Sequence, residues 1–190
     1  MAYKVADYKT DTHNDWCPGC GDFGVLNAIQ QALAQMQLPP EQVLLFSGVG
    51  CFAKTPHFVR TYGVHTLHGR SLPFAVGAKL ANPNLTVVSL GGDGDGYGIG
   101  AGHFLNTGRR NVDMLYLVFD NGVYGLTKGQ FSATADLGSK AKSGVMNELP
   151  PIDLCGLAIE LGCSFVGRSF AGDPKQLVAL LKAAGSHRGT

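Results

Sequence analysis

Three short apolar runs in this chain each lead directly into a loop rich in glycine and polar residues. The runs are "QVLLFS" at 42–47, "LTVVSLGG" at 85–92 and "VDMLYLVFDN" at 112–121. Each is apolar throughout rather than alternating, which is typical of strands buried on both faces. Helical patterns lie between and after these runs, so strands and helices alternate along the chain. The sequence therefore predicts an α/β fold with a parallel sheet flanked by helices.

The segments with helical patterns carry recognisable start signals. Asp22 is a candidate N-cap for the first of them, and Pro174 stands at the first position of the last. We also expect a short strand at 163–167 and a long polar loop at 122–150. The helices are predicted at 22–37, 71–82, 97–108, 152–162 and 173–185.

Residues capable of chemistry follow each of the three strands. The first strand leads into "GVGC", which ends at Cys51. The second leads into "GGDGDG", with Asp93 and Asp95, and the third leads into Asp120 and Asn121. In open parallel sheets, ligands bind beyond the carboxyl ends of the strands. We therefore expect an active site at this edge of the sheet.

Asp93 stands in a glycine-rich loop just before a predicted helix, where a carboxylate often serves only as an N-cap. The number of glycines exceeds what a cap needs, and the pair Asp120-Asn121 follows the next strand. Oxygen ligands from two loops suit magnesium, which shares phosphate oxygens, and a helix N-terminus offers N–H groups to the phosphate. A calcium loop of the EF-hand type would need a glutamate where Phe104 stands, and no P-loop motif is present.

The N-terminal stretch "WCPGCG" holds Cys17 and Cys20 at a spacing that suits a disulfide, a zinc ion or an iron–sulfur cluster. A zinc site would take His65 and His68 as its other ligands. Cys51 stands at the carboxyl end of the first strand, and the spacing of Cys17 and Cys20 alone leaves all three uses open.

Composition sets limits on the partners and the compartment. The net charge of +1 and the lack of a basic run make nucleic acid an unexpected partner, and no apolar stretch reaches the length of a membrane span. The five cysteines are an odd number, and no signal peptide is visible, so we expect a cytoplasmic protein. Cys155 and Cys163 fall in apolar segments and are expected to pack in the core. Charged residues make up only 15%, which indicates that a partner subunit covers part of the surface.

Gly92-Asp93-Gly94, followed by Asn121 after one helix and one strand, resembles the thiamine diphosphate signature. The resemblance implies a thiamine diphosphate-binding fold. It also implies that Asp93, Asn121 and the backbone carbonyl of Val123 hold Mg²⁺ on the diphosphate. The family commonly has Asn-Asn where this chain has Asp120-Asn121, a mild departure.

The motifs "CPGCG", "GVGC", "HTLHGRSLPFAVGAKLANP" and "NGVYGLTKGQFSAT" together resemble the beta subunit of 2-oxoacid:ferredoxin oxidoreductases. That family oxidatively decarboxylates a 2-oxo acid to acyl-coenzyme A and CO2, and it passes electrons through a [4Fe-4S] cluster to ferredoxin. "YGLTKGQ" favours 2-oxoglutarate, with pyruvate possible. Cys17, Cys20 and Cys51 match the first three cluster cysteines, and the fourth is expected beyond Thr190.

The resemblance also implies an organisation. Residues 1–190 form one thiamine diphosphate-binding domain, with an iron–sulfur segment at 14–22, and we expect the subunit to continue past 190. An alpha subunit would supply the glutamate that activates thiamine, so the chain alone should be inactive.

Three residues are expected to take part in catalysis. Lys54 is expected to meet the substrate carboxylate, and His68 and Arg70 are expected to face the diphosphate or the substrate. Other expected cofactor-binding residues are Gly50, Cys51, His68, Gly92, Gly94, Asp95, Gly125 and Leu126.

Two alternatives remain open at this point. One is a non-redox thiamine diphosphate-dependent decarboxylase subunit in which the cysteines are incidental. The other is a zinc-stabilised module without enzymatic activity.

Overall fold

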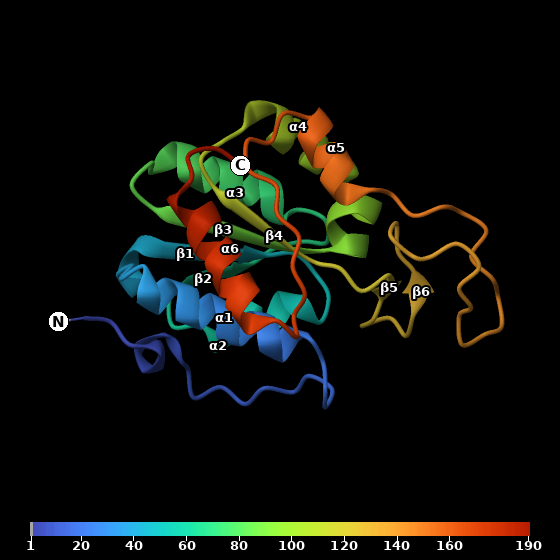
Figure 1. The fold of residues 1–190 in the computed structure, drawn as a ribbon, viewed down its shortest axis with the longest axis horizontal. Coiled ribbons are helices and arrows are strands. Elements are labelled where there is room, and N and C mark those ends of the chain that lie inside the picture. The colour runs from blue at the N-terminus through green and yellow to red at the C-terminus, as the bar shows by residue number, and fades with distance from the viewer. Residues whose placement is uncertain (1) are drawn as a thin grey trace.

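The structure, a computed structural model, describes residues 2–190 as a parallel sheet between two layers of helices (Figure 1). The four strands lie in the order β2-β1-β3-β4, and every neighbouring pair is parallel. This arrangement confirms the predicted fold class. The strands are β1 (Val43–Ser47), β2 (Tyr62–His65), β3 (Thr86–Gly92) and β4 (Leu115–Phe119).

The apolar strands bury both of their faces, as the uninterrupted runs predicted. In β1, Val43 and Leu45 contribute to one core cluster, and Phe46 contributes to the other. In β3, Leu90 belongs to the first cluster and Val87 belongs to the second. Successive side chains of a strand point to opposite faces, so an all-apolar strand requires a helix layer on each side.

The helices cover the two faces in separate groups. Helices α1 (Asp22–Gln35) and α6 (Pro174–Ser186) pack on the face that holds Leu45 and Leu90. Helices α3 (Ser71–Ala81), α4 (Ala101–Arg110) and α5 (Leu154–Glu160) pack on the other face. The short helix α2 (Thr55–Phe58) follows the loop after β1.

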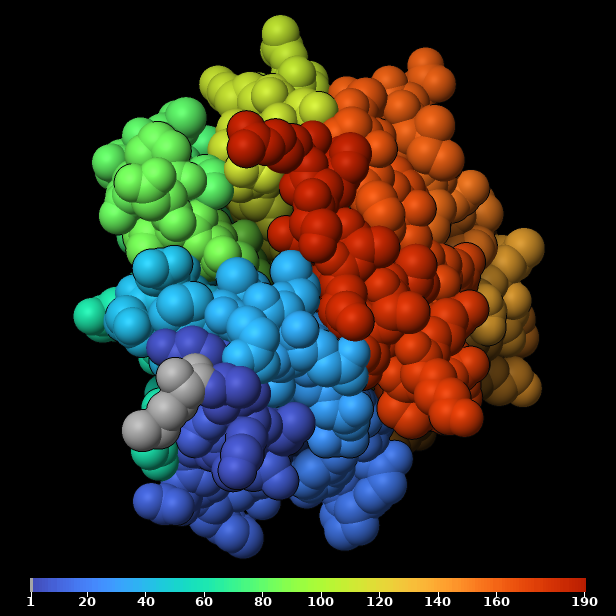
Figure 2. Space-filling model, turned by 60° about the vertical axis from the view of Figure 1, so that its left-hand side comes forward, coloured from blue at the N-terminus to red at the C-terminus, as the bar shows by residue number. Residues whose placement is uncertain are grey.

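The first and the last long helices of the chain lie on the same side of the sheet. Helices α1 and α6 lie side by side, and the red C-terminal residues rest against the blue helix in the space-filling view (Figures 1 and 2). The N-terminal segment is anchored by Tyr8, which is fully buried and donates its hydroxyl to the carbonyls of Leu33 and Leu38. Elements remote in sequence thus share one core.

Two sequence predictions about strands were wrong. Residues 163–167 are extended but form no strand, because the N–H groups of Ser164 and Phe165 donate to the carbonyl of Thr190 instead of a sheet neighbour. The apolar pattern there reflects packing against the second helix layer. Conversely, β2 was not predicted, since its four residues are exposed and include a glycine.

Three boundaries also differ from the predictions. Asp22 is the first helical residue of α1 rather than its cap, and Gly21 occupies the cap position. A π-helical turn at Gly94–Ile99 precedes α4, which begins at Ala101 rather than at 97. The loop at 122–150 contains a small antiparallel pair, β5 (Val123–Tyr124) with β6 (Gln130–Phe131). Within residues 2–190, no helix has the length and apolar character that a membrane crossing requires.

Candidate functional site

The loops after β3 and β4 meet at the carboxyl edge of the sheet. The backbone N–H of Gly122 donates to Asp93 Oδ2 at 2.7 Å, which joins the glycine-rich turn to the Asp120-Asn121 loop. The strands themselves are paired in parallel up to Gly92 and Phe119. The expectation that these two loops are neighbours is therefore confirmed.

The Asp93 carboxylate is buried, with 2% of the residue exposed, and its hydrogen bonds fall on one oxygen. Oδ2 accepts from Gly122 N, from Ser132 Oγ at 2.6 Å and from Thr134 Oγ1 at 2.7 Å. Oδ1 accepts no hydrogen bond from the described residues. A carboxylate fixed in this way, with one oxygen free, fits a ligand of a divalent cation.

The Asn121 loop turns sharply beside this carboxylate. Asn121 Oδ1 accepts from the N–H of Val123 at 3.0 Å, and Gly122 between them has a φ of +75°. Glycine adopts that left-handed conformation without a steric penalty, whereas other residues are strained there. Asp120 is held by the same hydroxyl that bonds Asp93, since Thr134 Oγ1 lies 2.7 Å from Asp120 Oδ1.

The glycines of the turn allow aromatic rings to lie directly on the backbone. A Cβ at Gly94 would overlap the ring of Tyr124, and one at Gly96 would overlap the hydroxyl of Tyr116. The Tyr124 hydroxyl donates to the carbonyl of Gly94 at 3.0 Å. Rings of the same chain thus occupy the space that these glycines leave open. At Gly92, a Cβ would likewise crowd the ring of Phe52.

Asp95 ties three loops together. Its Oδ1 accepts from the N–H of Val49 at 2.9 Å, from the N–H of Gly69 at 2.7 Å and from His68 Nδ1 at 2.6 Å. These partners follow β1 and β2, while Asp95 itself follows β3. Its Oδ2 is buried without a partner and lies against Gly48, where a side chain would not fit.

His68 and Arg70 lie next to Asp95 and its hydrogen-bond partners. The His68 ring bonds Asp95 through Nδ1 and stands edge-on to Tyr124, with ring centroids 6.0 Å apart. Nε2 is then the ring nitrogen left for a ligand. Arg70 caps the start of α3 and donates from Nη1 to the carbonyl of His68 at 3.2 Å.

The cysteine segment is joined to the loop after β1 by the indole of Trp16. Its Nε1 donates to the carbonyl of Cys51 at 2.7 Å, and a turn bonds Cys20 N to the carbonyl of Cys17 at 3.0 Å. Burial raises the pKa of the Cys20 and Cys51 thiols, and the negative charge of Asp22 adds to the effect. All five cysteines are free.

No three His, Cys, Asp or Glu side chains between residues 2 and 190 converge as a metal site would require. Cys17, Cys20 and Cys51 are therefore an open set of thiols rather than a closed ligand cage. His65 is exposed, and its Nδ1 lies 3.1 Å from Ser47 Oγ and 3.2 Å from the carbonyl of Ala53, so the zinc arrangement with Cys17 and Cys20 gains no support.

The two remaining cysteines lie away from this set. Cys163 packs against the second core cluster, as predicted. Cys155, on α5, is only partly buried.

Lys54 and Gly125 lie close to Cys51, and the N–H of Lys54 donates to the carbonyl of Cys51 at 3.3 Å. Lys54 Nζ forms an ion pair with Asp15 Oδ2 at 2.6 Å, and both side chains are solvent-accessible. A Cβ at Gly125 would lie 3.7 Å from Cys51 Sγ, so the loop after β4 passes beside this thiol. Leu126 is more than half exposed.

Sequence reasoning missed three residues of this region: Asp15, Ser132 and Thr134. Asp15 gives no signal of its own in the polar N-terminus. The hydroxyls of Ser132 and Thr134 stand two positions apart in "FSAT", a spacing that places both on one side of an extended segment. That spacing is a weak signal, because it recurs in many surface loops.

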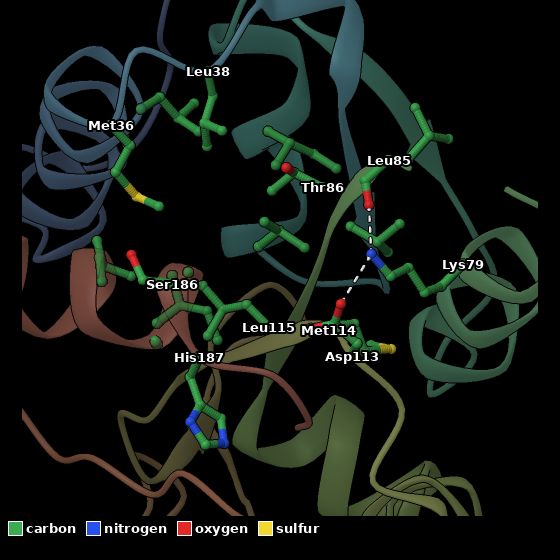
Figure 3. Close-up of a pocket in the computed structure, with 18 of the residues that line it drawn as sticks. Met36, Leu38, Lys79, Leu85, Thr86, Asp113, Met114, Leu115, Ser186 and His187 are labelled. Atoms are coloured by element: carbon green, nitrogen blue, oxygen red, sulfur yellow. Dashed lines mark hydrogen bonds and ion pairs between the residues drawn. The ribbon is translucent and has the colours of Figure 1, made fainter. Parts of the chain in front are cut away.

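A cavity lies elsewhere, at the amino ends of β3 and β4 (Figure 3). It measures about 710 Å³ and is lined mainly by apolar side chains of α1, α6 and these strands. Lys79 spans one side, donating to the carbonyl of Leu85 at 2.8 Å and lying 3.4 Å from Asp113 Oδ2. None of the predicted site residues lines this cavity. We assign the functional site to the carboxyl edge because the polar groups converge there.

Residues 48–190 match the family model described as "Thiamine pyrophosphate enzyme, C-terminal TPP binding domain". The chain is 54% identical over 93% of its length to the 2-oxoacid:ferredoxin oxidoreductase subunit beta of Saccharolobus solfataricus, covering 59% of that protein. It is 41% identical over 98% of its length to the 2-oxoglutarate oxidoreductase subunit KorB of Mycobacterium tuberculosis, covering 50% of it.

A solved structure is similar as well. The 2-oxoglutarate:ferredoxin oxidoreductase from Magnetococcus marinus, with 2-oxoglutarate, coenzyme A and succinyl-CoA bound, superposes with a TM-score of 0.96 at 42% identity. The match covers 98% of this chain and 64% of that one. The chain thus spans between half and two thirds of the length of these relatives.

Proposed function

Because the chain belongs to the thiamine pyrophosphate enzymes through their C-terminal TPP-binding domain, we propose that it is part of the beta subunit of a 2-oxoacid:ferredoxin oxidoreductase. The proposed reaction is oxidative decarboxylation of a 2-oxo acid, with 2-oxoglutarate favoured, to acyl-coenzyme A. Relatives named as beta subunits of 2-oxoacid:ferredoxin oxidoreductases support it. The observation that carries the redox part is the Trp16–Cys51 bond, which joins the Cys17–Cys20 segment to the edge that also holds Asp93.

In the proposed site, Asp93 Oδ1, the Asn121 amide oxygen and the Val123 carbonyl hold Mg²⁺ on thiamine diphosphate. The free Oδ1 supports this assignment, as does the turn that brings the 121–123 backbone against Asp93. Thiamine diphosphate supplies the electron sink for decarboxylation. The partly buried Tyr116 and Tyr124 rings pack on the glycine-rich turn and hold its backbone in place.

Cys17, Cys20 and Cys51 are the proposed thiolate ligands of a [4Fe-4S] cluster, and a fourth ligand is needed. Neither Cys155 nor Cys163 is near the set, so we place that ligand in a further segment of the subunit. Such clusters are held by four cysteine thiolates. The thiols must lose their protons to bind iron, and the pKa of Cys20 and Cys51 is raised. Iron binding itself must therefore drive their deprotonation.

Lys54, His68 and Arg70 are proposed to contact the substrate or the diphosphate. Lys54 offers an ammonium close to Cys51, and this ammonium forms an ion pair with Asp15. His68 offers Nε2, because Asp95 holds Nδ1.

The proposed partners are an alpha subunit, ferredoxin and coenzyme A. The name "subunit beta" of the relative from Saccharolobus solfataricus implies that an alpha subunit exists. The cytoplasmic location expected from the free cysteines is part of the same proposal.

The cluster assignment is tested by anaerobic purification of the assembled enzyme and of its Cys51→Ser and Cys163→Ser variants. The wild-type protein and the Cys163→Ser control are expected to be brown, with about four irons per beta subunit. Cys51→Ser should lose most of the iron and the broad visible absorbance. Equal iron content in all three proteins, or none in the wild type, would contradict the redox assignment.

The reaction is tested separately by the release of thiamine diphosphate on denaturation and by turnover with a panel of 2-oxo acids. We expect bound thiamine diphosphate, and reduction of ferredoxin that depends on coenzyme A and is fastest with 2-oxoglutarate. Bound thiamine diphosphate with aldehyde release and no ferredoxin reduction would favour a non-redox decarboxylase instead.

A further inference from the structure

Two hydroxyl side chains of the segment after β6 are bonded to the carboxylate that opens the glycine-rich turn. Ser132 Oγ and Thr134 Oγ1 lie 2.6 Å and 2.7 Å from Asp93 Oδ2. We propose that Ser132 and Thr134 are positioning residues that orient Asp93 for a divalent cation. This inference rests on the proposed function, because it takes Asp93 as a ligand of the cation.

The distribution of hydrogen bonds on Asp93 is one-sided. Ser132, Thr134 and the N–H of Gly122 all donate to Oδ2, and together they fix the rotation of the carboxylate about its side chain. Oδ1 is left as the oxygen that a cation can take. Hydrogen bonds to a ligating carboxylate from outside the coordination sphere orient it, and their loss typically costs about 10–100-fold in metal affinity.

The charges around Asp93 point the same way. Within residues 2–190, no Lys, Arg or His side chain forms an ion pair with Asp93 or Asp120. Asp93 is nevertheless 2% exposed, and a buried carboxylate is costly unless it is paired or fully hydrogen-bonded. Neutral donors cover only one of its oxygens, so a cation at Oδ1 would complete its surroundings.

Thr134 connects Asp93 to the neighbouring carboxylate. Its Oγ1 is 2.7 Å from Asp93 Oδ2 and also 2.7 Å from Asp120 Oδ1. A hydroxyl has a single proton to donate, so the two carboxylates compete for it. Ser132 Oγ bonds Asp93 and lies 3.1 Å from Thr134 Oγ1, and the N–H of Gly122 bonds Asp93 as well. With these two donors on Asp93, Thr134 is able to turn its proton to Asp120 once a cation binds Asp93.

The test uses the assembled enzyme after removal of divalent metal with EDTA, with Mn²⁺ as the probe in the presence of thiamine diphosphate. Free Mn²⁺ is followed by electron paramagnetic resonance in the wild type and in Ser132→Ala, Thr134→Val and the double variant. We expect the double variant to bind Mn²⁺ roughly tenfold or more weakly, and each single variant to show a smaller loss.

Two control variants separate positioning from general damage. Thr134→Ser keeps the hydroxyl and should retain wild-type Mn²⁺ affinity. Ser169→Ala removes a surface hydroxyl that donates to Gln176 Oε1 and should also change nothing.

Wild-type Mn²⁺ affinity in the double variant would overturn the inference while leaving the proposed function intact. A wild-type enzyme that binds no Mn²⁺ with thiamine diphosphate would instead overturn the metal site itself. If circular dichroism shows that the double variant is unfolded, Ser132→Ala decides, and wild-type affinity in that variant overturns the inference.

Discussion

At the scale of single residues, buried carboxylates organise the site more than the glycines that surround them. Asp93 and Asp95 are two positions apart, yet they serve different loops. Asp93 bonds the segment after β4, whereas Asp95 bonds the segments after β1 and β2. The pattern "GDGDG" predicted two acids at the carboxyl edge but not this division, because hydrogen-bond partners depend on loops that are remote in sequence.

The role of Asp95 as a loop tie predicts different outcomes for two substitutions. Asp95→Ala leaves the N–H groups of Val49 and Gly69 without an acceptor and should lower the free energy of unfolding by about 2–4 kcal/mol. Asp95→Asn keeps an oxygen that can accept from both, so it should cost less than half as much. Urea denaturation of the two variants measures the difference, and equal losses would show that the negative charge matters rather than the acceptor.

Sequence reasoning at this scale found residue types better than it found partners. It identified Asp93, Asn121 and Cys51 from their positions after strands. It missed Ser132 and Thr134, because a hydroxyl in a polar loop carries no periodic signal. It also gave Lys54 no partner, whereas the structure pairs it with Asp15, thirty-nine positions earlier. Such long-range pairs depend on the fold and have no local sequence signature.

At the scale of elements, burial decided which predictions succeeded. The runs that became β1, β3 and β4 are apolar because helices cover both of their faces, and this pattern is visible in one sequence. The edge strand β2 has no such cover and so no such pattern. Residues 163–167 show the converse. Their apolar side chains pack against the core, but their backbone does not pair with a strand.

Glycines inside helices provide an element-scale prediction. Gly77 lies within α3 and is exposed, and a Cβ there would meet nothing within 4 Å. Gly77→Ala should therefore raise the free energy of unfolding of the isolated chain by about 0.5–1 kcal/mol, because alanine loses less backbone entropy in a helix.

Gly24→Ala, in α1, is the matched variant for which we expect the opposite change in stability. Its Cβ would overlap the carbonyl oxygen of Ala171, so this variant should be destabilised despite the better helix propensity. Thermal unfolding of both variants by circular dichroism checks the pair. A stabilised Gly24→Ala would show that the segment around Ala171 moves away freely.

At the scale of the whole molecule, the chain forms one three-layer unit with many apolar side chains left on its surface. Phe74 on α3, Leu105 on α4 and Leu126 beside the site are each at least 46% exposed. Relatives from Saccharolobus solfataricus and Aeropyrum pernix are named as beta subunits. The partner subunit proposed above would cover these apolar side chains.

We therefore expect the isolated chain to show no decarboxylation turnover with any 2-oxo acid, even with thiamine diphosphate and Mg²⁺ added. The reason is that no glutamate lies among the residues that meet at the carboxyl edge, and thiamine activation needs one. Turnover is expected only from the complete beta subunit, with its fourth cluster ligand, assembled with the alpha subunit. The measurement is CO2 release from 2-oxoglutarate, and turnover by the chain alone would contradict the assignment of that glutamate to a partner.

Trp16 gives this molecule a built-in optical reporter. It is the single tryptophan of the chain, 7% exposed, and its indole N–H is bonded to the carbonyl of Cys51. Its fluorescence therefore senses the docking of the cysteine segment onto the loop after β1. Iron bound near those thiols would quench the fluorescence of Trp16. The emission of this one side chain would therefore report assembly of the cluster in real time.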